Sequence, residues 1–310
     1  MKNKALSLTI LFEAESLNYG EGIGNVTQLK KMSRYNGQNY TYLSRQALRY
    51  NIANQMGIDN SKLTTHKDVI QFDGAQTIED SVEQDLFGYF ITKDKKEKSA
   101  KGKQGGNENT YSDKPRKRTA CVRLSNAISL EEYNSDTDFL TNLSFLNRYN
   151  EIAEKKKGGG NIAHSEINKS YYVYNLVIEL DKIGVDVNTD SNLSSEEKAK
   201  RVNALLDTIL LLSRDIKGRT ESLIPKFAVG GFYTRKNSFF SNTIKCYKNN
   251  LNVATLKDTI SLNDELSQNT MVAMMDGVFA NEEKLKKELE IISIRDMFNY
   301  LKKEVNNYYE

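Results

Sequence analysis

The stretch Ala5-Leu-Ser-Leu-Thr-Ile-Leu-Phe-Glu-Ala14 decides the fold, because apolar and polar side chains alternate along it. One face carries Leu6, Leu8, Ile10 and Phe12. The opposite face carries Ser7, Thr9 and Glu13. A period of two residues predicts a β-strand with one buried face and one half-exposed face.

A glycine-rich loop follows this strand, from Asn18 to Asn25. Its glycines have the spacing GxGxG, and about twenty residues separate them from the next expected helix, whereas a dinucleotide fingerprint is GxGxxG with the helix directly behind it. Two interpretations remain. The loop is either a flexible connection or a bare backbone surface that a sugar-phosphate chain can approach closely.

The next segment predicts a short amphipathic helix over Ser44–Met56. Ser44 is suited to cap its first turn, apolar residues recur every fourth position, and Gly57 follows as a stop. Arg45 and Arg49 are four residues apart and therefore lie side by side on this helix.

The later elements complete a recognisable order. We expect strands at Thr119–Ser125, Tyr171–Asp181 and Leu223–Phe232, and a helix that begins at the Ser194 capping box and continues towards Gly218. A long helix is expected over Asn281–Tyr308. Without insertions the order is strand, helix, strand, strand, helix, strand, which predicts an α+β fold with a ferredoxin-like or RRM-like palm.

Two large insertions interrupt this order, at residues 59–117 and 126–170. The first includes Lys93–Lys117, a basic segment with almost no apolar residue, which we expect to be a flexible loop. Arg116, Lys117 and Arg118 close it and are candidates for a second strip of nucleic-acid contacts, or for a solvated loop end.

Charge is distributed unevenly along the 310 residues, although the net charge is only +3. Residues 1–58 carry seven Lys and Arg against three acids, and Lys93–Arg118 carry ten against four. Segregated positive charge suits a surface that faces a polyanion, although solvated charge runs have the same pattern. The sequence has no apolar block of membrane-spanning length and no signal peptide, so we expect no membrane partner and a cytoplasmic location.

Ser44-Arg45-Gln46-Ala47-Leu48-Arg49 is the most informative stretch for function. A cation in the first helical turn opposes the helix dipole, so Arg45 behind the Ser44 cap calls for an anion, and free amides plus two arginines suit a phosphate. Lys30, Lys31 and Arg34 are nearby, interleaved with Tyr35, Tyr40 and Tyr42, whose rings are suited to stack on unpaired bases. The structural alternative is that both arginines pair with acids such as Glu13 or Glu15 on the adjacent strand.

No catalytic constellation emerges from the sequence. HExxH, GxSxG and Walker motifs are absent, and only two histidines, His66 and His164, occur, far apart. Cys121 and Cys246 are also separate, so we expect two core thiols and neither a disulfide nor a metal site. Glu13, Glu15 and Glu21 could in principle hold a metal, but structural ion pairing is the better interpretation. No catalytic residue, metal site or cofactor is therefore predicted.

Several of these segments resemble the DevR-type backbone subunit of type I-B CRISPR Cascade. They are the first strand with its Phe-Glu-Ala ending, Ser16–Gly20, Gly24-Asn25, Lys30-Lys31, Tyr42–Arg49, Cys121–Tyr133 and Tyr171–Gly184. The similarity spans most of the chain and is most specific in the first 57 residues.

The resemblance implies a modified RRM palm with finger-like and thumb-like insertions, several copies of which coat one CRISPR guide RNA as a filament. Its partners would be the guide RNA, neighbouring copies of itself, other Cascade subunits and the target DNA strand paired to the guide. The expected RNA contacts are Asn18, Tyr19, Gly20, Gly24, Asn25, Lys30, Lys31, Ser44, Arg45, Gln46 and Arg49, with Arg116, Lys117 and Arg118 as the second strip.

We assign the thumb to residues 126–170 and the fingers to residues 59–117, although the two could be exchanged. In related type III backbone subunits an aspartate after the first strand cleaves RNA, whereas Ala14–Leu43 contains no aspartate here. The resemblance therefore implies a non-catalytic subunit. An independent single-stranded RNA-binding protein and a metal-dependent ribonuclease remain the alternatives.

Overall fold

The computed structural model describes residues 5–15, 17–22, 24–35, 37–66, 68–92, 115–159 and 162–310. Residues 93–114 of the expected basic loop lie outside the described residues.

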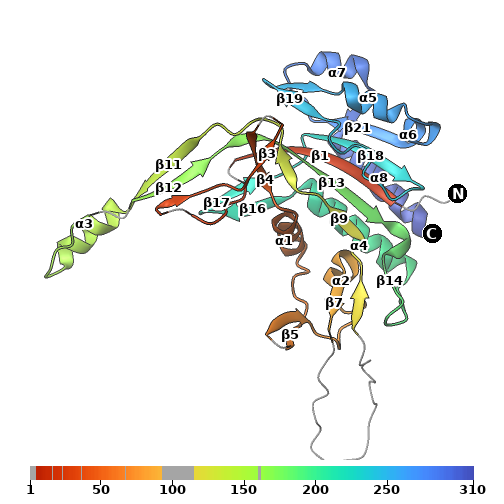
Figure 1. Ribbon diagram of the computed structural model, residues 1–310. Helices are drawn as coiled ribbons and strands as arrows, with labels where there is room; N and C mark the ends of the chain where they lie inside the picture. Colours follow the sequence, from red (N-terminus) through yellow and green to blue (C-terminus); the bar gives the residue numbers. More distant parts are fainter. Residues whose placement is uncertain are drawn as a thin grey trace, which may run out of the picture.

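A mixed sheet forms the centre of the molecule (Figure 1). Its strands are β1 (Ala5–Glu15), β3 (Lys31–Arg34), β4 (Gln38–Leu43), β9 (Val122–Leu124), β10 (Ala127–Ser129), β13 (Lys169–Glu179), β18 (Phe227–Tyr233), β21 (Thr270–Met274) and β22 (Ile291–Ser293). Their order is β22-β21-β18-β1-β13-β10-β4-β3, and β9 pairs with the end of β13 that β10 leaves free.

The expected ferredoxin-like palm is confirmed within this sheet. The chain passes from β1 through helix α1 (Arg45–Met56) to β9 and β13, then through helix α4 (Ser195–Leu210) to β18. The four strands lie in the order β18-β1-β13-β9, and every pair is antiparallel. This is the arrangement that two βαβ units sharing one sheet produce.

Helices cover one face of the sheet. α1, α4 and the C-terminal helix α8 (Ile294–Tyr309) pack there, as Figure 1 shows. The alternating apolar side chains of β1, such as Ile10 and Phe12, meet Leu48 of α1 and Leu206 of α4 in one buried core. The sequence periodicity of β1 therefore placed this face of the strand correctly.

The second face of β1 is buried too, so the expected half-exposed strand is wrong. Ser7 and Thr9 are each 1% exposed, and Thr9 Oγ1 donates a hydrogen bond of 2.6 Å to Asn175 Oδ1. A second apolar core that includes Leu11 and Val229 lies on this side. It is completed by a late segment with β19 (Lys245–Tyr247), β20 (Asn250–Asn252), α5 (Ala254–Ile260), α6 (Asp264–Asn269) and α7 (Glu282–Glu288).

The single helix expected over Asn281–Tyr308 is also wrong, because strand β22 separates α7 from α8. Ile291-Ile292-Ser293 pairs in parallel with β21, as its β-branched residues favour, and Ser293 then caps α8 through a 3.0 Å bond from Asp296 N–H.

Helix α4 ends at Leu210 and does not continue towards Gly218. Strands β16 (Ser213–Ile216) and β17 (Arg219–Ser222) form a hairpin there. Its turn residues Lys217 and Gly218 both have positive φ, 48° and 78°, which is the two-residue hairpin geometry that lets a chain reverse without splaying its strands.

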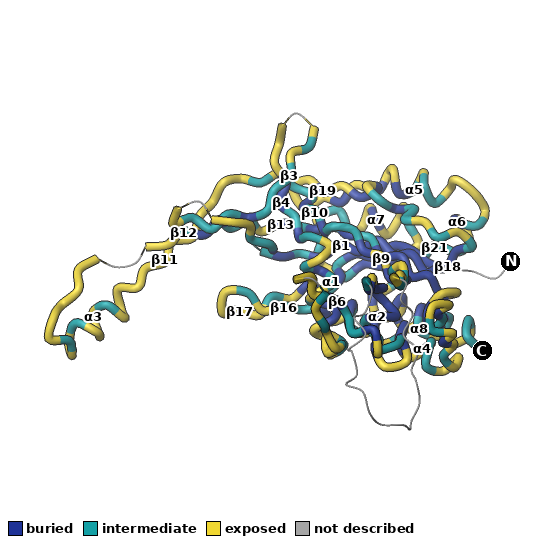
Figure 2. The backbone as a smooth tube through the Cα atoms, turned by 60° about the horizontal axis from the view of Figure 1, so that its bottom comes forward, coloured by how far each residue is buried: buried dark blue, intermediate teal, exposed yellow. Residues whose placement is uncertain are grey.

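A long arm projects from the sheet (Figure 1). It consists of β11 (Asp136–Thr141), α3 (Leu143–Ile152) and β12 (Ile162–Ile167). Figure 2 shows α3 and most of β11 as exposed, in contrast to the buried central strands. At its base, β12 pairs with β2 (Val26–Thr27), which belongs to the glycine-rich loop.

The other insertion lies below the sheet in Figure 1 and contains β5 (Leu63–His66), β6 (Val69–Phe72), α2 (Val82–Phe87), β7 (Tyr89–Ile91) and β8 (Arg116–Arg118). Beside it lie the short turn η1 (Leu180–Lys182), β14 (Val185–Asp186) and β15 (Ser191–Asn192). Leu86 and Phe87 of α2 join the helix-side core, so this insertion is fixed to the palm.

Candidate nucleic-acid interface

The start of helix α1 is the centre of the candidate interface. Ser44 caps it, with Oγ accepting from Ala47 N–H at 3.3 Å, and Asn18 Nδ2 donates to the same oxygen at 3.2 Å. The Arg45 N–H donates to Asn126 Oδ1 at 2.8 Å. The first turn contains no acidic residue, so no side chain of the helix itself offsets the positive end of its dipole.

An open depression of about 680 Å³ lies directly in front of this helix start. We call it the α1 depression. Its lining residues are Lys30, Tyr42, Ser44, Arg45, Gln46, Leu124, Ser125 and Asn126. The structure thus brings together four of the residues expected at the site, namely Lys30, Ser44, Arg45 and Gln46. Sequence analysis missed the opposite wall, which comes from β9 and the turn into β10.

The two helix arginines have different surroundings. Arg49 forms an ion pair of 2.8 Å with Glu83 and lies 5.0 Å from the centre of the Phe87 ring. Arg45 is exposed and forms no ion pair with any residue that the structure describes. An exposed guanidinium without a described ion pair, at the rim of a depression, can bind an incoming anion without first breaking such a contact, so Arg45 is the stronger candidate.

The structural alternative, in which both arginines pair with internal acids such as Glu13 or Glu15, holds for Arg49, which pairs with Glu83, but not for Arg45 among the described residues. Glu13 pairs with Lys169 at 3.1 Å and Glu15 with Arg219 at 2.8 Å. The interpretation of these two glutamates as structural ion-pairing groups is therefore confirmed.

Three of the expected site residues hold the base of the arm instead of lining the α1 depression. Tyr19 OH donates to the Glu166 carbonyl at 3.1 Å, and Lys31 Nζ pairs with the Glu166 carboxylate at 2.7 Å. The Asn25 carbonyl accepts from His164 N–H at 2.8 Å. Glu166 also accepts from Leu29 N–H at 2.8 Å, which makes this buried carboxylate the link between the glycine-rich loop and β12.

The glycine-rich loop is therefore anchored on both sides. Gly20 N–H donates to the Gln28 carbonyl at 2.8 Å, and the Tyr19 backbone bridges to Leu29. Lys217 lies 3.8 Å from the centre of the Tyr19 ring, and burial lowers the pKa of this lysine. Gly24 has a φ of 60°, a conformation in which glycine is favoured, and its α-carbon faces open space. The described ends of the loop are therefore held by hydrogen bonds, and its role as a flexible connection or as a bare surface for a sugar-phosphate chain stays a prediction.

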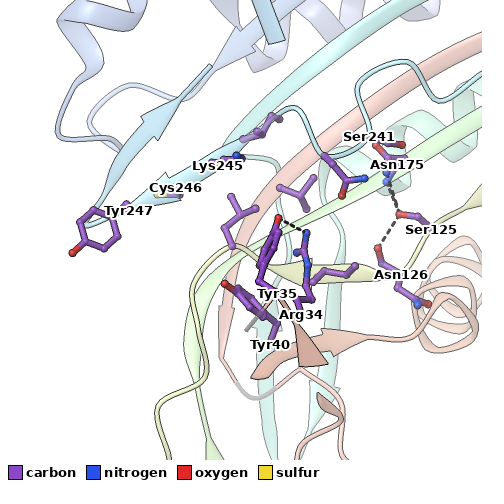
Figure 3. A pocket seen from close by; sticks show the side chains of 15 residues that line it. Arg34, Tyr35, Tyr40, Ser125, Asn126, Asn175, Ser241, Lys245, Cys246 and Tyr247 are labelled. Atoms are coloured by element: carbon purple, nitrogen blue, oxygen red, sulfur yellow. Dashed lines mark hydrogen bonds between the residues drawn. The ribbon is translucent and has the colours of Figure 1, made fainter. Parts of the chain in front are cut away.

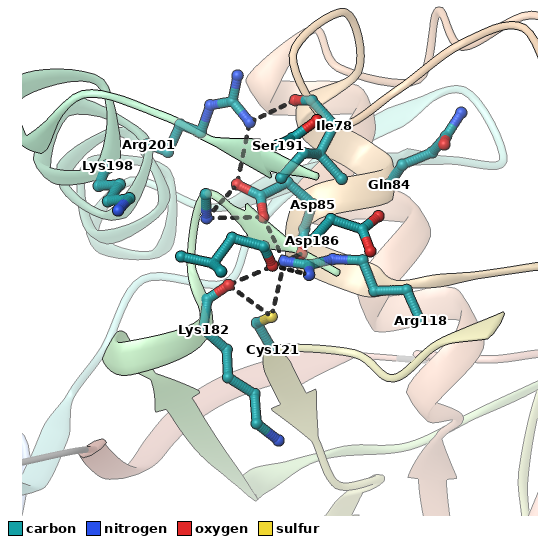
Figure 4. Close-up of polar contacts among 12 residues, drawn as sticks. Ile78, Gln84, Asp85, Arg118, Cys121, Lys182, Asp186, Ser191, Lys198 and Arg201 are labelled. Atoms are coloured by element: carbon teal, nitrogen blue, oxygen red, sulfur yellow. Dashed lines mark hydrogen bonds and ion pairs between the residues drawn. The ribbon is translucent and has the colours of Figure 1, made fainter. Parts of the chain in front are cut away.

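The second basic strip, at Arg116–Arg118, does not line the α1 depression. Lys117 is exposed, and Arg116 donates to the Gly74 carbonyl. Arg118 is 7% exposed and pairs with the fully buried Asp85, which also pairs with Arg201 at 2.9 Å (Figure 4). An arginine held this way cannot reach a phosphate, so Arg118 is withdrawn from the expected RNA contacts.

No group of three or more His, Cys, Asp or Glu side chains within the described ranges is arranged to hold a metal ion. Both cysteines are free and buried, as expected for core thiols. Among the described helices, none is long and apolar enough to cross a membrane.

Solved structures place this architecture in a known class. One chain titled "CRISPR RNA-guided surveillance complex, pre-nicking" superimposes with a TM-score of 0.57 and 11% identity, over 97% of this chain and 100% of that chain. Another, titled "CRISPR RNA-guided surveillance complex", gives a TM-score of 0.50 and 13% identity, over 88% and 90% of the two chains. At these identities the matches establish the fold alone.

The family follows from the sequence itself. Residues 6–250 match the family model described as CRISPR-associated negative auto-regulator DevR/Csa2. The chain belongs to this family, which confirms the resemblance drawn from the first strand and the Ser44 helix. No similar sequence was found among curated proteins.

Proposed function

We propose that this chain is a non-catalytic backbone subunit of a type I-B CRISPR interference complex that binds the guide RNA. The observation that carries the proposal is the α1 depression, where Arg45, Lys30 and the capped helix start present positive charge with no described internal counter-ion in the first turn of α1. A phosphate there would receive charge-assisted hydrogen bonds from these side chains at the positive end of the helix dipole. Family membership makes the guide RNA the natural source of that phosphate.

The proposal extends to copies of the chain that follow one another along the guide. The arm at residues 136–167 supports this extension, because none of the ten residues of α3 is buried. Phe145 is 65% exposed and Ile152 is 86% exposed. An isolated helix of this length is marginal in water and gains stability by burying its apolar face, so we assign the arm as the thumb that contacts a neighbouring copy.

The insertion at residues 59–117 then provides the fingers, facing other Cascade subunits or the target DNA strand paired to the guide. Cleavage of that DNA is assigned to a separate nuclease. The ion pairs of Glu13 and Glu15 support a subunit without a metal centre at this position. The metal-dependent ribonuclease is thus the weaker alternative.

The double substitution Lys30→Glu and Arg45→Glu tests the proposal. The purified wild-type protein should carry a discrete short RNA, and the variant should retain about tenfold to a hundredfold less, because two charge-assisted contacts become repulsive. RNA is measured by extraction and sequencing at moderate salt. The matched control is Lys200→Glu with Lys284→Glu, which changes the net charge equally at two side chains that are 77% and 72% exposed on α4 and α7.

The proposal fails if the charge-reversed variant folds and keeps its RNA, or if the control loses as much. Nuclease footprinting distinguishes the proposed filament subunit from the remaining alternative, an independent RNA-binding protein. A filament subunit protects RNA cooperatively at even spacing, whereas an independent single-stranded RNA-binding protein binds a long RNA as isolated monomers.

A further inference from the structure

A second concave site lies beside the α1 depression, on the sheet face opposite the helices (Figure 3). It is a cleft of about 570 Å³ between the β3–β4 hairpin and residues 241–247. We call it the aromatic cleft. Ser125 and Asn126 line both sites, so the cleft and the depression are adjacent.

One wall of the aromatic cleft consists of two tyrosines around an arginine. The Arg34 guanidinium carbon lies 5.2 Å from the ring centres of both Tyr35 and Tyr40, and the two rings are 6.5 Å apart. Arg34 also donates to Tyr35 OH at 3.4 Å (Figure 3). These contacts orient Tyr35, which is nevertheless 74% exposed, so most of its ring surface is accessible to solvent.

The backbone explains why Tyr35 is presented so openly. Tyr35 has a φ of 49°, which is uncommon for a bulky residue and costs free energy. Contacts with Arg34 and Tyr40 hold the Tyr35 ring beside the cleft. Because the Tyr35 ring is so exposed, it packs against little of the protein and adds little to the stability of the core.

Residues 241–247 form the other wall, with Lys245 as a second cation and Tyr247 at the outer end (Figure 3). Lys245 and Tyr247 lie on β19, and Tyr247 is 72% exposed. Lys248 lies 5.3 Å from the centre of the Tyr247 ring. Between the walls, the amide side chains of Asn126 and Asn175 lie at the end of the cleft that borders the α1 depression (Figure 3).

Two titratable groups of the cleft, Tyr40 and Cys246, are held in their neutral forms by burial. Burial raises the pKa of Tyr40, and it raises the pKa of the Cys246 thiol to about 11. The cleft is therefore lined by cations, aromatic faces and amides, and none of its lining residues carries a carboxylate. Aromatic faces stack on bases of any sequence, and amides pair with base edges.

We propose that the aromatic cleft binds an unpaired nucleobase of the same RNA strand whose phosphates occupy the α1 depression. The inference rests on the proposed function and adds a base-binding subsite to it. Asn126 sits at the junction, because it lines both sites and its Oδ1 accepts a hydrogen bond from Arg45 N–H. A nucleotide at this point would place its phosphate at Arg45 and its base against Tyr35.

Tyr35→Asn is the test substitution, because asparagine tolerates the left-handed backbone conformation that the turn requires. Binding is measured with a single-stranded oligouridine that carries one 2-aminopurine, whose fluorescence falls when it stacks. We expect Tyr35→Asn and Tyr247→Ala each to weaken binding by about tenfold and to reduce the quenching. Tyr35→Phe keeps the ring and should restore both. Tyr300→Ala, at a 47% exposed tyrosine on the distant α8, is the matched control.

The outcomes separate the two proposals. If Lys30→Glu with Arg45→Glu loses RNA while Tyr35→Asn and Tyr247→Ala bind and quench like wild type, the base subsite is overturned and the proposed function stands. If the RNA-free Tyr35→Asn protein loses self-association instead of RNA affinity, the cleft binds a segment of a second copy and the inference is also overturned. A wild-type protein that binds no RNA overturns both.

Discussion

Arg118 and Arg45 both come from the basic segments of the chain, yet the structure treats their charges in opposite ways. Arg118 is almost fully buried and shares the carboxylate of Asp85 with Arg201. Arg45 is exposed at the rim of the α1 depression and has no ion pair with a described residue. One guanidinium stabilises the fold, and the other is available to a ligand.

The difference shows how a basic segment comes to stabilise the fold or to bind a ligand. The position of nearby acidic residues decides this more than the density of basic residues does. Asp85 also accepts from Gly184 N–H, so it joins α2, β8, α4 and the turn before β14 (Figure 4). A buried carboxylate with two arginines neutralises charge that would otherwise oppose burial. The first turn of α1 contains no acid of its own, and no carboxylate in the described part of the chain pairs with Arg45.

Asp85→Asn should have the largest effect, because it leaves Arg118 and Arg201 buried with no carboxylate between them. We expect the free energy of unfolding to fall by about 3–5 kcal/mol, measured by urea denaturation. Asp258→Asn, at an exposed position on α5, should change it by less than about 0.5 kcal/mol. An Asp85→Asn protein as stable as the control would show that the buried arginines are accommodated by their carbonyl partners and, for Arg201, by Glu197.

The palm could be predicted because its elements are encoded locally. The alternation of β1, the Ser44 cap and the Gly57 stop each lie within a few residues of the element that they define. The errors arose where distant segments decide the outcome. The second face of β1 is covered by residues more than two hundred positions later, and β22 forms only because β21 offers it an edge.

The candidate site could also be predicted only where its residues are close together in the sequence. Lys30, Ser44, Arg45 and Gln46 are close in sequence to the helix cap, and they share one depression. Asn126, its opposite wall, is 81 residues from Arg45 and had no local pattern to indicate it. Lys31 was expected beside Lys30, but Glu166, 135 residues away, engages its charge.

Glu179 offers a third arrangement, in which a buried carboxylate faces partly exposed cations. Burial alone would raise its pKa, but hydrogen bonds from Lys182 and Lys236 and the nearby Arg123 lower it. A carboxyl group with a lowered pKa in the folded state stabilises the protein above its ordinary pKa of about 4.3, and this contribution is lost as the pH falls through the lowered value.

Glu179→Gln should therefore cost about 1–3 kcal/mol of stability at pH 7 and progressively less below about pH 4. Urea midpoints of wild type and variant at pH 7 and at acid pH provide the measurement, and Glu290→Gln, outside the described ion pairs, is a control. A difference between the two proteins that grows on acidification contradicts the assignment of Glu179 as the carboxylate of this cluster.

The smallest expected effect is on the salt dependence of RNA affinity, in a direct comparison of the two arginines of α1. Arg45→Gln should lower the slope of log affinity for single-stranded RNA against log salt by about 0.7, because one phosphate contact and its released counter-ion are lost. Arg49→Gln should leave that slope nearly unchanged, because the Arg49 charge is already offset by Glu83. Both variants remove one positive charge from the same helix, so net charge cannot explain a difference between them. Equal slopes for the two variants would mean that RNA displaces Glu83 from Arg49, and the distinction between engaged and available cations would then fail at this site.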